Sequence, residues 1–225
     1  MSMKYLLGID LGTSGTKTVL FGQDGHAVCS ATVEYPMAQP QNGWAEDPRD
    51  WWNAAVETLR KVIGESGVNP EDIAGIGISG QMHSLVMLDE SGDVLRPAIL
   101  WCDQRTAAEC DEITRRVGAE RLIEITANPA LTGFTAGKIL WVRNHEPEVY
   151  AKCRHILLPK DYLRYKLTGA FATEVSDASG MQLLDVPNRC WSAEVLEKLE
   201  IDPALLGKVY ESPEITGYVT AEAAA

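Results

Sequence analysis

The sequence predicts an α/β fold with a mixed central sheet, a strand meander at its start and flanking helices. Three apolar runs, at residues 5–11, 16–21 and 27–33, are separated by short turns and predict consecutive antiparallel strands. A helical pattern over residues 48–63 leads into a further apolar run at 73–79. Because a helix between two strands is typical of a crossover into the same sheet, this last run is expected to join the sheet.

The turn between the first two strands has the composition of a phosphate-binding loop. Gly12 and Gly15 let the backbone turn sharply and let an anion approach its N–H groups. Thr13 and Ser14 add hydroxyl donors, and Lys17 adds a cation that would reach phosphate oxygens. An ordinary hairpin turn has the same composition, so the turn alone does not decide between the two interpretations.

Asp10 favours the phosphate-binding interpretation. A carboxylate at the end of a buried strand is costly to desolvate unless a cation meets it, and a metal ion bound to nucleotide phosphates would do so. The glycine spacing matches neither the P-loop nor the dinucleotide fingerprint, and no helix pattern follows the turn. The stretch therefore predicts a strand-turn-strand phosphate loop with a metal near Asp10.

The later elements follow from caps, turns and apolar periodicity. Asp24 and Gly25 predict a tight turn, and Asp47 before Pro48 is typical of a helix start. Further strands are expected at residues 85–88, 94–95, 97–101, 155–158 and 216–220, and helices at 107–117, within 118–145, from 159 to 169 and at 191–199. No linker-like stretch divides the chain, so residues 1–225 are expected to form a single domain.

Gln81, Met82 and His83 follow the strand expected at 73–79. Ligands in open α/β sheets bind beyond the carboxyl ends of the strands, which places these three side chains at a candidate site. A lone histidine is nevertheless more often a hydrogen-bonded core residue than a ligand contact. The residues alone leave both interpretations open.

Trp101, Asp103 and Arg105 supply a ring face, an acceptor and a donor fork, which suit a polyol. Asp103 is a candidate sugar contact, although it would equally cap the helix expected at 107–117. Trp101 is expected to lie in the core.

Composition excludes several functional classes. A net charge of −12 and a pI near 4.8 argue against nucleic acid or an anionic membrane as a partner. Five cysteines without metal-ligand spacing predict reduced thiols in a cytoplasm, and no apolar run approaches the ~20 residues needed to span a bilayer. We expect a cytoplasmic protein without an export signal.

Residues 8–17 resemble the first phosphate loop of the FGGY family of carbohydrate kinases, which belongs to the actin-like ATPase superfamily with a ribonuclease H-like fold. Further segments that resemble the same family lie at residues 80–83, 97–105, 158–169 and 173–180. Gln81-Met82-His83 is similar to xylulokinases in particular. The resemblance runs along most of the chain and implies an N-terminal lobe of such a kinase.

The resemblance implies transfer of a phosphoryl group from ATP, with Mg²⁺, to a pentulose, with D-xylulose giving xylulose 5-phosphate. It implies that Asp10 positions hydrated Mg²⁺, that Gly12, Thr13, Ser14 and Lys17 hold phosphate, and that Gln81, Met82, His83 and Asp103 bind the sugar. Asp177 is a weaker candidate, since its segment lies beside the cleft in the family. The partners are thus a small sugar and Mg·ATP.

The family's catalytic base is a carboxylate after a glycine-rich segment, and no such segment precedes residue 225. The base and the C-terminal lobe are therefore expected beyond the chain, and residues 1–225 alone are expected to be inactive, because general-base catalysis supplies ~10²–10⁴-fold. The surface that faces the second lobe would be apolar, which makes a homodimer an expectation. The alternatives are an FGGY kinase for ribulose, fuculose, gluconate or glycerol-like substrates, and a non-catalytic actin-like binding module.

Overall fold

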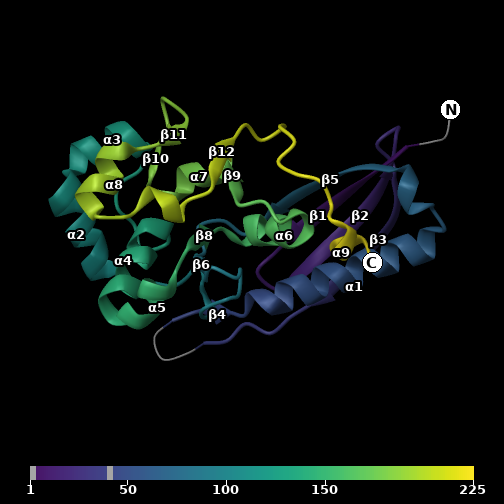
Figure 1. Ribbon diagram of the computed structural model, residues 1–225, viewed down its shortest axis with the longest axis horizontal. Coiled ribbons are helices and arrows are strands. Elements are labelled where there is room, and N and C mark those ends of the chain that lie inside the picture. Colours follow the sequence, from purple (N-terminus) through teal and green to yellow (C-terminus); the bar gives the residue numbers. More distant parts are fainter. Residues whose placement is uncertain (1–3, 40–42) are drawn as a thin grey trace. The chain divides into compact units, whose positions relative to one another are not determined.

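The computed structural model describes residues 4–39 and 43–225, which divide into two units that are described separately (Figure 1). The first unit comprises Met1–Met37 and Asp47–Gln81, and the second comprises Ala38–Glu46 and Met82–Ala225. The chain therefore crosses between the units more than once. In the described residues, no helix is long and apolar enough to cross a membrane.

The first unit is built on a four-stranded mixed sheet in the order β3-β2-β1-β5. Strands β1, β2 and β3 pair antiparallel as the predicted meander, and β5 pairs parallel with β1 after the predicted crossover. The bounds are β1 Tyr5–Leu11, β2 Gly15–Gly22, β3 Ala27–Glu34, α1 Pro48–Ser66, a 3₁₀ turn Pro70–Asp72 and β5 Ile73–Gly80.

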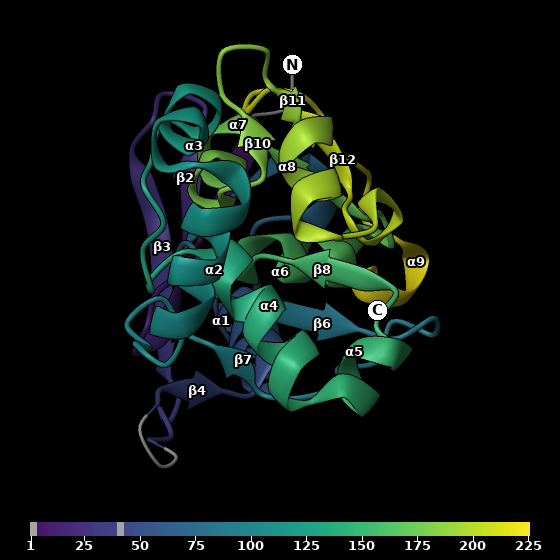
Figure 2. The same ribbon diagram turned by 90° about the vertical axis from the view of Figure 1, so that its left-hand side faces the viewer.

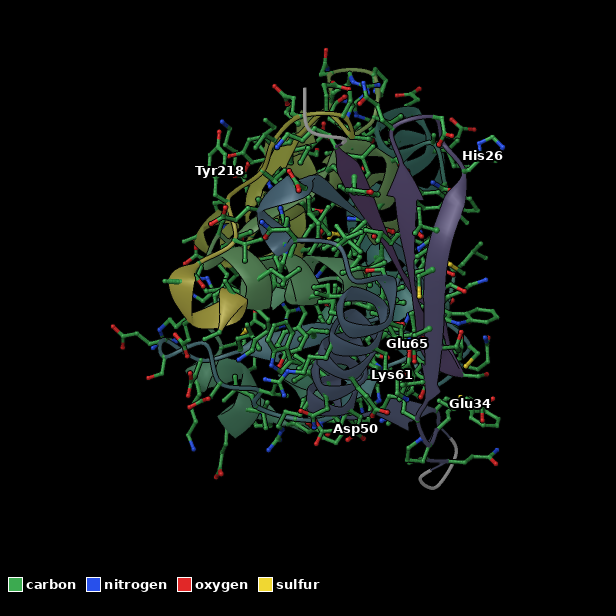
Figure 3. The ribbon with its side chains drawn as sticks, turned by 90° about the vertical axis from the view of Figure 1, so that its right-hand side faces the viewer. His26, Glu34, Asp50, Lys61, Glu65 and Tyr218 are labelled. Atoms are coloured by element: carbon green, nitrogen blue, oxygen red, sulfur yellow. The ribbon has the colours of Figure 1, made fainter. Side chains whose placement is uncertain are left out.

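Helix α1 packs against β2 and β3 of this sheet, as Figure 3 shows. Its start follows the predicted cap, because Asp47 accepts a hydrogen bond from the Arg49 backbone N–H. The helix extends beyond the pattern expected at 48–63 to Ser66, and Gly67 ends it in the left-handed conformation, at φ 66°. Leu20 and Val62 are fully buried in the apolar layer between sheet and helix. The meander and the helix thus form a packed layer that supports the turn between β1 and β2.

The second unit contains helices and four short two-stranded sheets around its own apolar core. Helix α2 packs against α3, α4 and α8, which lie together in Figure 2. The helices are α2 Ala107–Val117, α3 Ala119–Thr126, α4 Thr135–His145, α5 Pro147–Lys152, α6 Pro159–Thr168, α7 Val175–Ala178, α8 Ala193–Leu199 and α9 Ala221–Ala224, with 3₁₀ turns at Ser179–Met181 and Pro203–Leu205. The paired strands are β4 Ala45–Glu46 with β7 Ala98–Ile99, β6 Val86–Leu88 with β8 His155–Leu157, β9 Ala172–Glu174 with β12 Lys208–Tyr210, and β10 Leu184–Asp185 with β11 Cys190–Trp191.

The structure corrects some of the predictions for the second unit. Residues 216–220 form no strand, because their side chains are mostly exposed and Thr220 donates its backbone N–H to Leu167 of α6 instead of to a strand. The helix expected at 191–199 begins only at Ala193, because Ser192 caps it and Trp191 pairs in β11. The helix expected at 107–117 is confirmed as α2, and of the two roles left open for Asp103 the N-cap is not observed, because Thr106 occupies that position.

Candidate functional site

The turn between β1 and β2 is closed by backbone hydrogen bonds and by close packing. The Gly12 N–H donates to the Gly15 carbonyl at 3.0 Å. A Cβ atom on Gly15 would lie 2.7 Å from the Val33 carbonyl oxygen, and one on Gly12 would lie 3.1 Å from the Gly15 oxygen. Both positions therefore favour glycine because a neighbouring backbone comes too close for a side chain.

Tyr35, which the sequence did not point to, supports the same turn. Its hydroxyl donates a short hydrogen bond to the Gly12 carbonyl, and its backbone N–H donates to the Ser14 carbonyl at 3.3 Å. These two bonds tie the turn to the residue that follows β3. Ser14 and Lys17 remain exposed, and Thr13 is half-buried, so hydroxyl and ammonium donors border the turn.

Asp10 ends β1 as predicted, but its environment differs from the prediction. The side chain is exposed rather than buried, so the argument from desolvation is wrong. Its Oδ1 accepts a hydrogen bond from the Ser79 hydroxyl at 2.8 Å, because Ser79 is its neighbour in the parallel β5 strand. On the other side, Lys17 is its cross-strand partner in β2. The carboxylate is thus oriented by Ser79 and still open to solvent.

The donor set at Asp10 fits a hydrated Mg²⁺. In the described residues no group of three or more acidic, histidine or cysteine side chains is arranged to hold a metal ion. Mg²⁺ commonly keeps several waters and binds one or two carboxylates together with substrate phosphates, so a single exposed carboxylate such as Asp10 is sufficient.

Gln81 completes the first unit at the end of β5. Its backbone N–H donates to the Leu11 carbonyl at 2.7 Å, and only 6% of the residue is exposed. Met82 and His83 belong to the second unit, where Met82 is 37% exposed. The three candidates follow one another in sequence but differ sharply in accessibility.

His83 is held through both its ring and its backbone. Its φ of 61° is left-handed, and its Nδ1 lies 3.0 Å from the Gly180 carbonyl oxygen. Because a carbonyl only accepts, this contact assigns the proton to Nδ1 and leaves Nε2 as an acceptor. Burial lowers the pKa of His83, which favours this neutral form. A Cβ on Gly180 would lie 2.3 Å from the ring, so a glycine is needed there.

Asp103 does not have the environment expected of a sugar contact. Its side chain is completely buried, and its oxygens accept hydrogen bonds from the Trp44 N–H at 2.7 Å and from the backbone and guanidinium of Arg105. Burial opposes its charged form, but these hydrogen bonds lower its pKa. Trp101 is 37% exposed, so its predicted place in the core is wrong.

Asp177 lies in an ion-pair cluster. Lys160 Nζ contacts Asp177 at 3.2 Å, Asp161 at 2.8 Å and Glu174 at 3.3 Å. Burial raises the pKa of Asp177 to about 6, since it outweighs the charge of Lys160. Burial alone would raise the pKa of Glu174. The hydrogen bond from Ser212 and the charge of Lys160 outweigh burial and lower the pKa to about 2. Asp177 is thus a buried carboxylate in ion-pair contact with Lys160.

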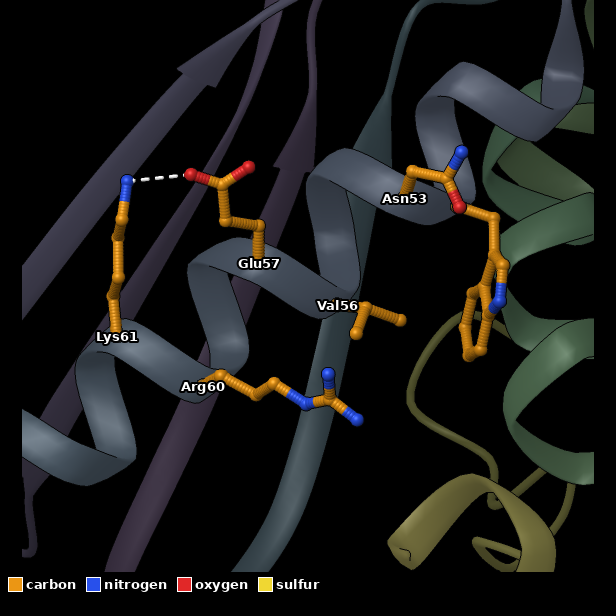
Figure 4. A pocket seen from close by; sticks show the side chains of 6 residues that line it. Asn53, Val56, Glu57, Arg60 and Lys61 are labelled. Carbon is orange, nitrogen blue, oxygen red and sulfur yellow. Dashed lines mark hydrogen bonds and ion pairs between the residues drawn. The ribbon is translucent and has the colours of Figure 1, made fainter.

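The pocket in Figure 4 lies on the surface of α1 and contains none of the candidate residues. Its lining is Trp52, Asn53, Val56, Glu57, Arg60 and Lys61, with an ion pair of 2.7 Å between Glu57 and Lys61. A groove that one helix forms with itself does not surround a ligand, so we assign no function to it.

Known proteins resemble this chain along nearly its whole length. Residues 5–225 match the family model described as the N-terminal domain of the FGGY family of carbohydrate kinases. A curated xylulose kinase of Lactococcus lactis is 46% identical over 226 residues, which cover 99% of this chain and 44% of that protein.

Solved structures show the same fold. A xyloylose kinase from Brucella ovis is 37% identical with a TM-score of 0.90, over 97% of this chain and 46% of that one. A gluconate kinase from Lactobacillus acidophilus is 29% identical with a TM-score of 0.91, over 99% of this chain and 45% of that one. The chain spans less than half the length of these relatives. They confirm the predicted fold class, an α/β lobe of the actin-like ATPase type, and the chain belongs to the FGGY family of carbohydrate kinases.

Proposed function

We propose that the protein containing these residues transfers the γ-phosphoryl group of ATP to a pentulose, converting D-xylulose to xylulose 5-phosphate. The observation that carries the proposal is Asp10: an exposed carboxylate, oriented by Ser79, at the end of a strand that leads into the Gly12–Gly15 turn. The xylulose kinase relatives and the Gln81-Met82-His83 sequence support the choice of sugar.

Phosphoryl transfer depends mainly on positioning and on charge stabilisation. Asp10 would hold a hydrated Mg²⁺ through its free oxygen, and this ion would neutralise phosphate charge. The Thr13 and Ser14 hydroxyls and the Lys17 ammonium would hold phosphate oxygens, and the tight Gly12–Gly15 turn would let the phosphate approach the backbone. In the second unit, His83 Nε2 would accept a hydrogen bond from a sugar hydroxyl, and the Met82 side chain would form part of the wall of the sugar site. Gln81, which is 6% exposed, would support the end of β5 in the first unit.

We place the general base outside this chain. Asp103 is fully buried and hydrogen-bonded, and Asp177 is paired with Lys160, so neither carboxylate is free to accept a hydroxyl proton. The relatives extend well beyond the matched region, which leaves room for the base and for an adenosine site. A cytoplasmic location and a homodimer remain predictions.

A coupled assay of the full-length protein with ATP tests the proposal. D-xylulose should give the highest kcat/KM in a panel with ribulose, fuculose, gluconate and glycerol. Gluconate is the second candidate, because a gluconate kinase shares the fold at 29% identity. Isothermal titration should detect binding of both D-xylulose and Mg·ATP. A non-catalytic binding module would bind neither, which would refute the proposal.

A further inference from the structure

The backbone of His83 needs support from its surroundings. A left-handed φ of 61° is unfavourable for a non-glycine residue, and such conformations persist only where other contacts hold them. The ring contact to Gly180 holds the side chain but not the peptide that follows. The support for that peptide comes from the start of helix α4.

Two side chains of α4 donate to the carbonyl oxygen of His83. Thr135 Oγ1 donates at 2.9 Å and Lys138 Nζ at 3.3 Å. The ring of Phe134, one residue before α4, contacts the His83 ring edge to face at a centroid distance of 4.4 Å. Thr135 and Lys138 are both completely buried, so water does not compete with the His83 carbonyl for these two donors.

Lys138 does more than fill space in the core. Its ammonium donates to the Gly133 carbonyl through a short contact and to the Phe134 carbonyl at 3.1 Å. The Thr132 carbonyl follows at 3.5 Å, and among the described residues no carboxylate forms an ion pair with Lys138. A buried cation without a counter-ion is costly, and burial lowers the pKa of Lys138 to about 7. Both the ammonium and the neutral amine carry N–H donors, so either form links residues 132–134 to His83.

We infer that Lys138 and Thr135 are positioning residues, which hold the His83 peptide in the left-handed conformation and thereby present Nε2 to the sugar. The inference rests on the proposed function of His83. It predicts that removing either donor weakens sugar binding without touching the phosphate loop, which belongs to the other unit. It also predicts that a hydroxyl at position 135 is sufficient, because only the donor to the carbonyl is needed.

The test uses the full-length protein with Lys138→Met, Thr135→Val and Thr135→Ser. Lys138→Met keeps the volume and removes the buried charge, but it also leaves the carbonyl oxygens of His83, Gly133 and Phe134 without this donor, so its thermal unfolding is measured beside its kinetics. We expect it to raise KM for D-xylulose about 5- to 100-fold with little change in KM for ATP, as for the loss of a hydrogen bond in a site. Thr135→Val should also raise KM for D-xylulose. Thr135→Ser keeps the hydroxyl and should keep the wild-type KM.

Matched controls separate this role from a general effect on the fold. Lys152→Met removes an exposed lysine from α5, and Thr114→Val removes a hydroxyl that donates to a helix carbonyl at 2.9 Å in α2. Neither should change KM for D-xylulose. Unchanged KM for D-xylulose in both Lys138→Met and Thr135→Val, in an active enzyme, would overturn the inference.

A second measurement does not depend on turnover. In wild-type protein labelled at histidine, the ring ¹⁵N shifts of His83 should show a proton on Nδ1, and Lys138→Met should shift the population toward the other tautomer or raise the pKa of the ring. If the wild type phosphorylates no sugar in the panel, the proposed function fails. Even in that case, identical His83 spectra in wild type, Lys138→Met and Thr135→Val would refute the positioning role.

Discussion

Asp10 and His83 illustrate how the role of one polar residue depends on its immediate contacts. Asp10 is exposed, and a single hydrogen bond from Ser79 orients it, so one carboxylate oxygen stays available to a cation. His83 is half-buried, and contacts with Gly180, Thr135 and Lys138 hold its ring and its backbone. We therefore expect substitutions at these two positions to affect different kinetic constants.

Asp10→Asn in the full-length protein should lower kcat by at least ~100-fold and leave KM for D-xylulose nearly unchanged, since it weakens metal positioning and not the sugar contacts. Steady-state kinetics with each substrate varied in turn measures both effects. Asp24→Asn, in the exposed turn between β2 and β3, is the matched control. Turnover of Asp10→Asn close to wild type would remove Asp10 from the mechanism.

His83→Ala should cost about 1–3 kcal/mol of D-xylulose binding, because a sugar hydroxyl would lose its acceptor. Isothermal titration gives the affinity, and thermal unfolding of the same sample gives the stability. A large loss of stability with unchanged sugar affinity would instead identify His83 as a hydrogen-bonded core residue.

At the scale of elements, the turn between β1 and β2 depends on a contact from outside the hairpin. Strands β1 and β2 bring the turn into place, but Tyr35, after β3, bonds to it at two backbone positions. The sequence signal of the turn is local, and its role as a phosphate loop stays a prediction. The Tyr35 contact spans 23 residues and follows from the packing of the meander.

Tyr35→Phe should raise KM for ATP several-fold and leave KM for D-xylulose unchanged. The variant loses only the hydroxyl donor to Gly12, a loss on the order of 1 kcal/mol, and keeps the ring. The measurement is a kinetic titration of ATP at saturating sugar. Tyr218→Phe, at an exposed position in the second unit, provides the control. Equal KM values for ATP in wild type and Tyr35→Phe would show that the turn keeps its shape without this bond.

At the scale of the whole molecule, the buried Lys138 makes stability depend on pH. Its folded pKa of about 7 lies below the ~10.4 of an exposed lysine, so between these values the unfolded chain binds more protons. The contribution of this group to the free energy of unfolding therefore rises with pH across that window, and its full penalty applies below pH 7.

Chemical unfolding of wild type and Lys138→Met at pH 7 and pH 9 measures this slope. Relative to wild type, the variant should be more stable at pH 7 than at pH 9, because only wild type carries the cost of the buried ammonium. Besides burial, the charges of Asp103, Cys110 and Cys102 raise the pKa of Lys138 and that of Arg105 lowers it, without offsetting the effect of burial. A constant difference between the two curves would contradict a lowered pKa for Lys138.

The lobe by itself should bind D-xylulose without sustained turnover. Its candidate carboxylates for a general base, Asp103 and Asp177, are buried or ion-paired, and the base supplies ~10²–10⁴-fold in rate. A coupled assay on the purified 225-residue chain, beside the full-length protein, gives the answer. Sustained turnover would require a base within the chain, with Asp177→Asn as the first variant to examine.

The sequence by itself determined the elements whose signals lie within a few residues. The meander, helix α1 with its caps, the Gly12–Gly15 turn and the position of Gln81-Met82-His83 after β5 all follow from turn chemistry and apolar periodicity. The strand expected at 216–220 failed because periodicity does not show whether a neighbouring strand is available to pair. The organisation of residues 1–225 as a single domain stays a prediction, and the structure divides the chain into two compact units.

Only the tertiary structure decided how the site residues are held. The contact of His83 with Gly180 spans 97 residues and that with Lys138 spans 55, and no local pattern indicates either. Asp103 has the residue type of a sugar contact, yet folding buries it against Trp44 and Arg105. The physical reason is common to these cases: exposure, protonation and backbone conformation depend on which distant groups packing brings within hydrogen-bond distance.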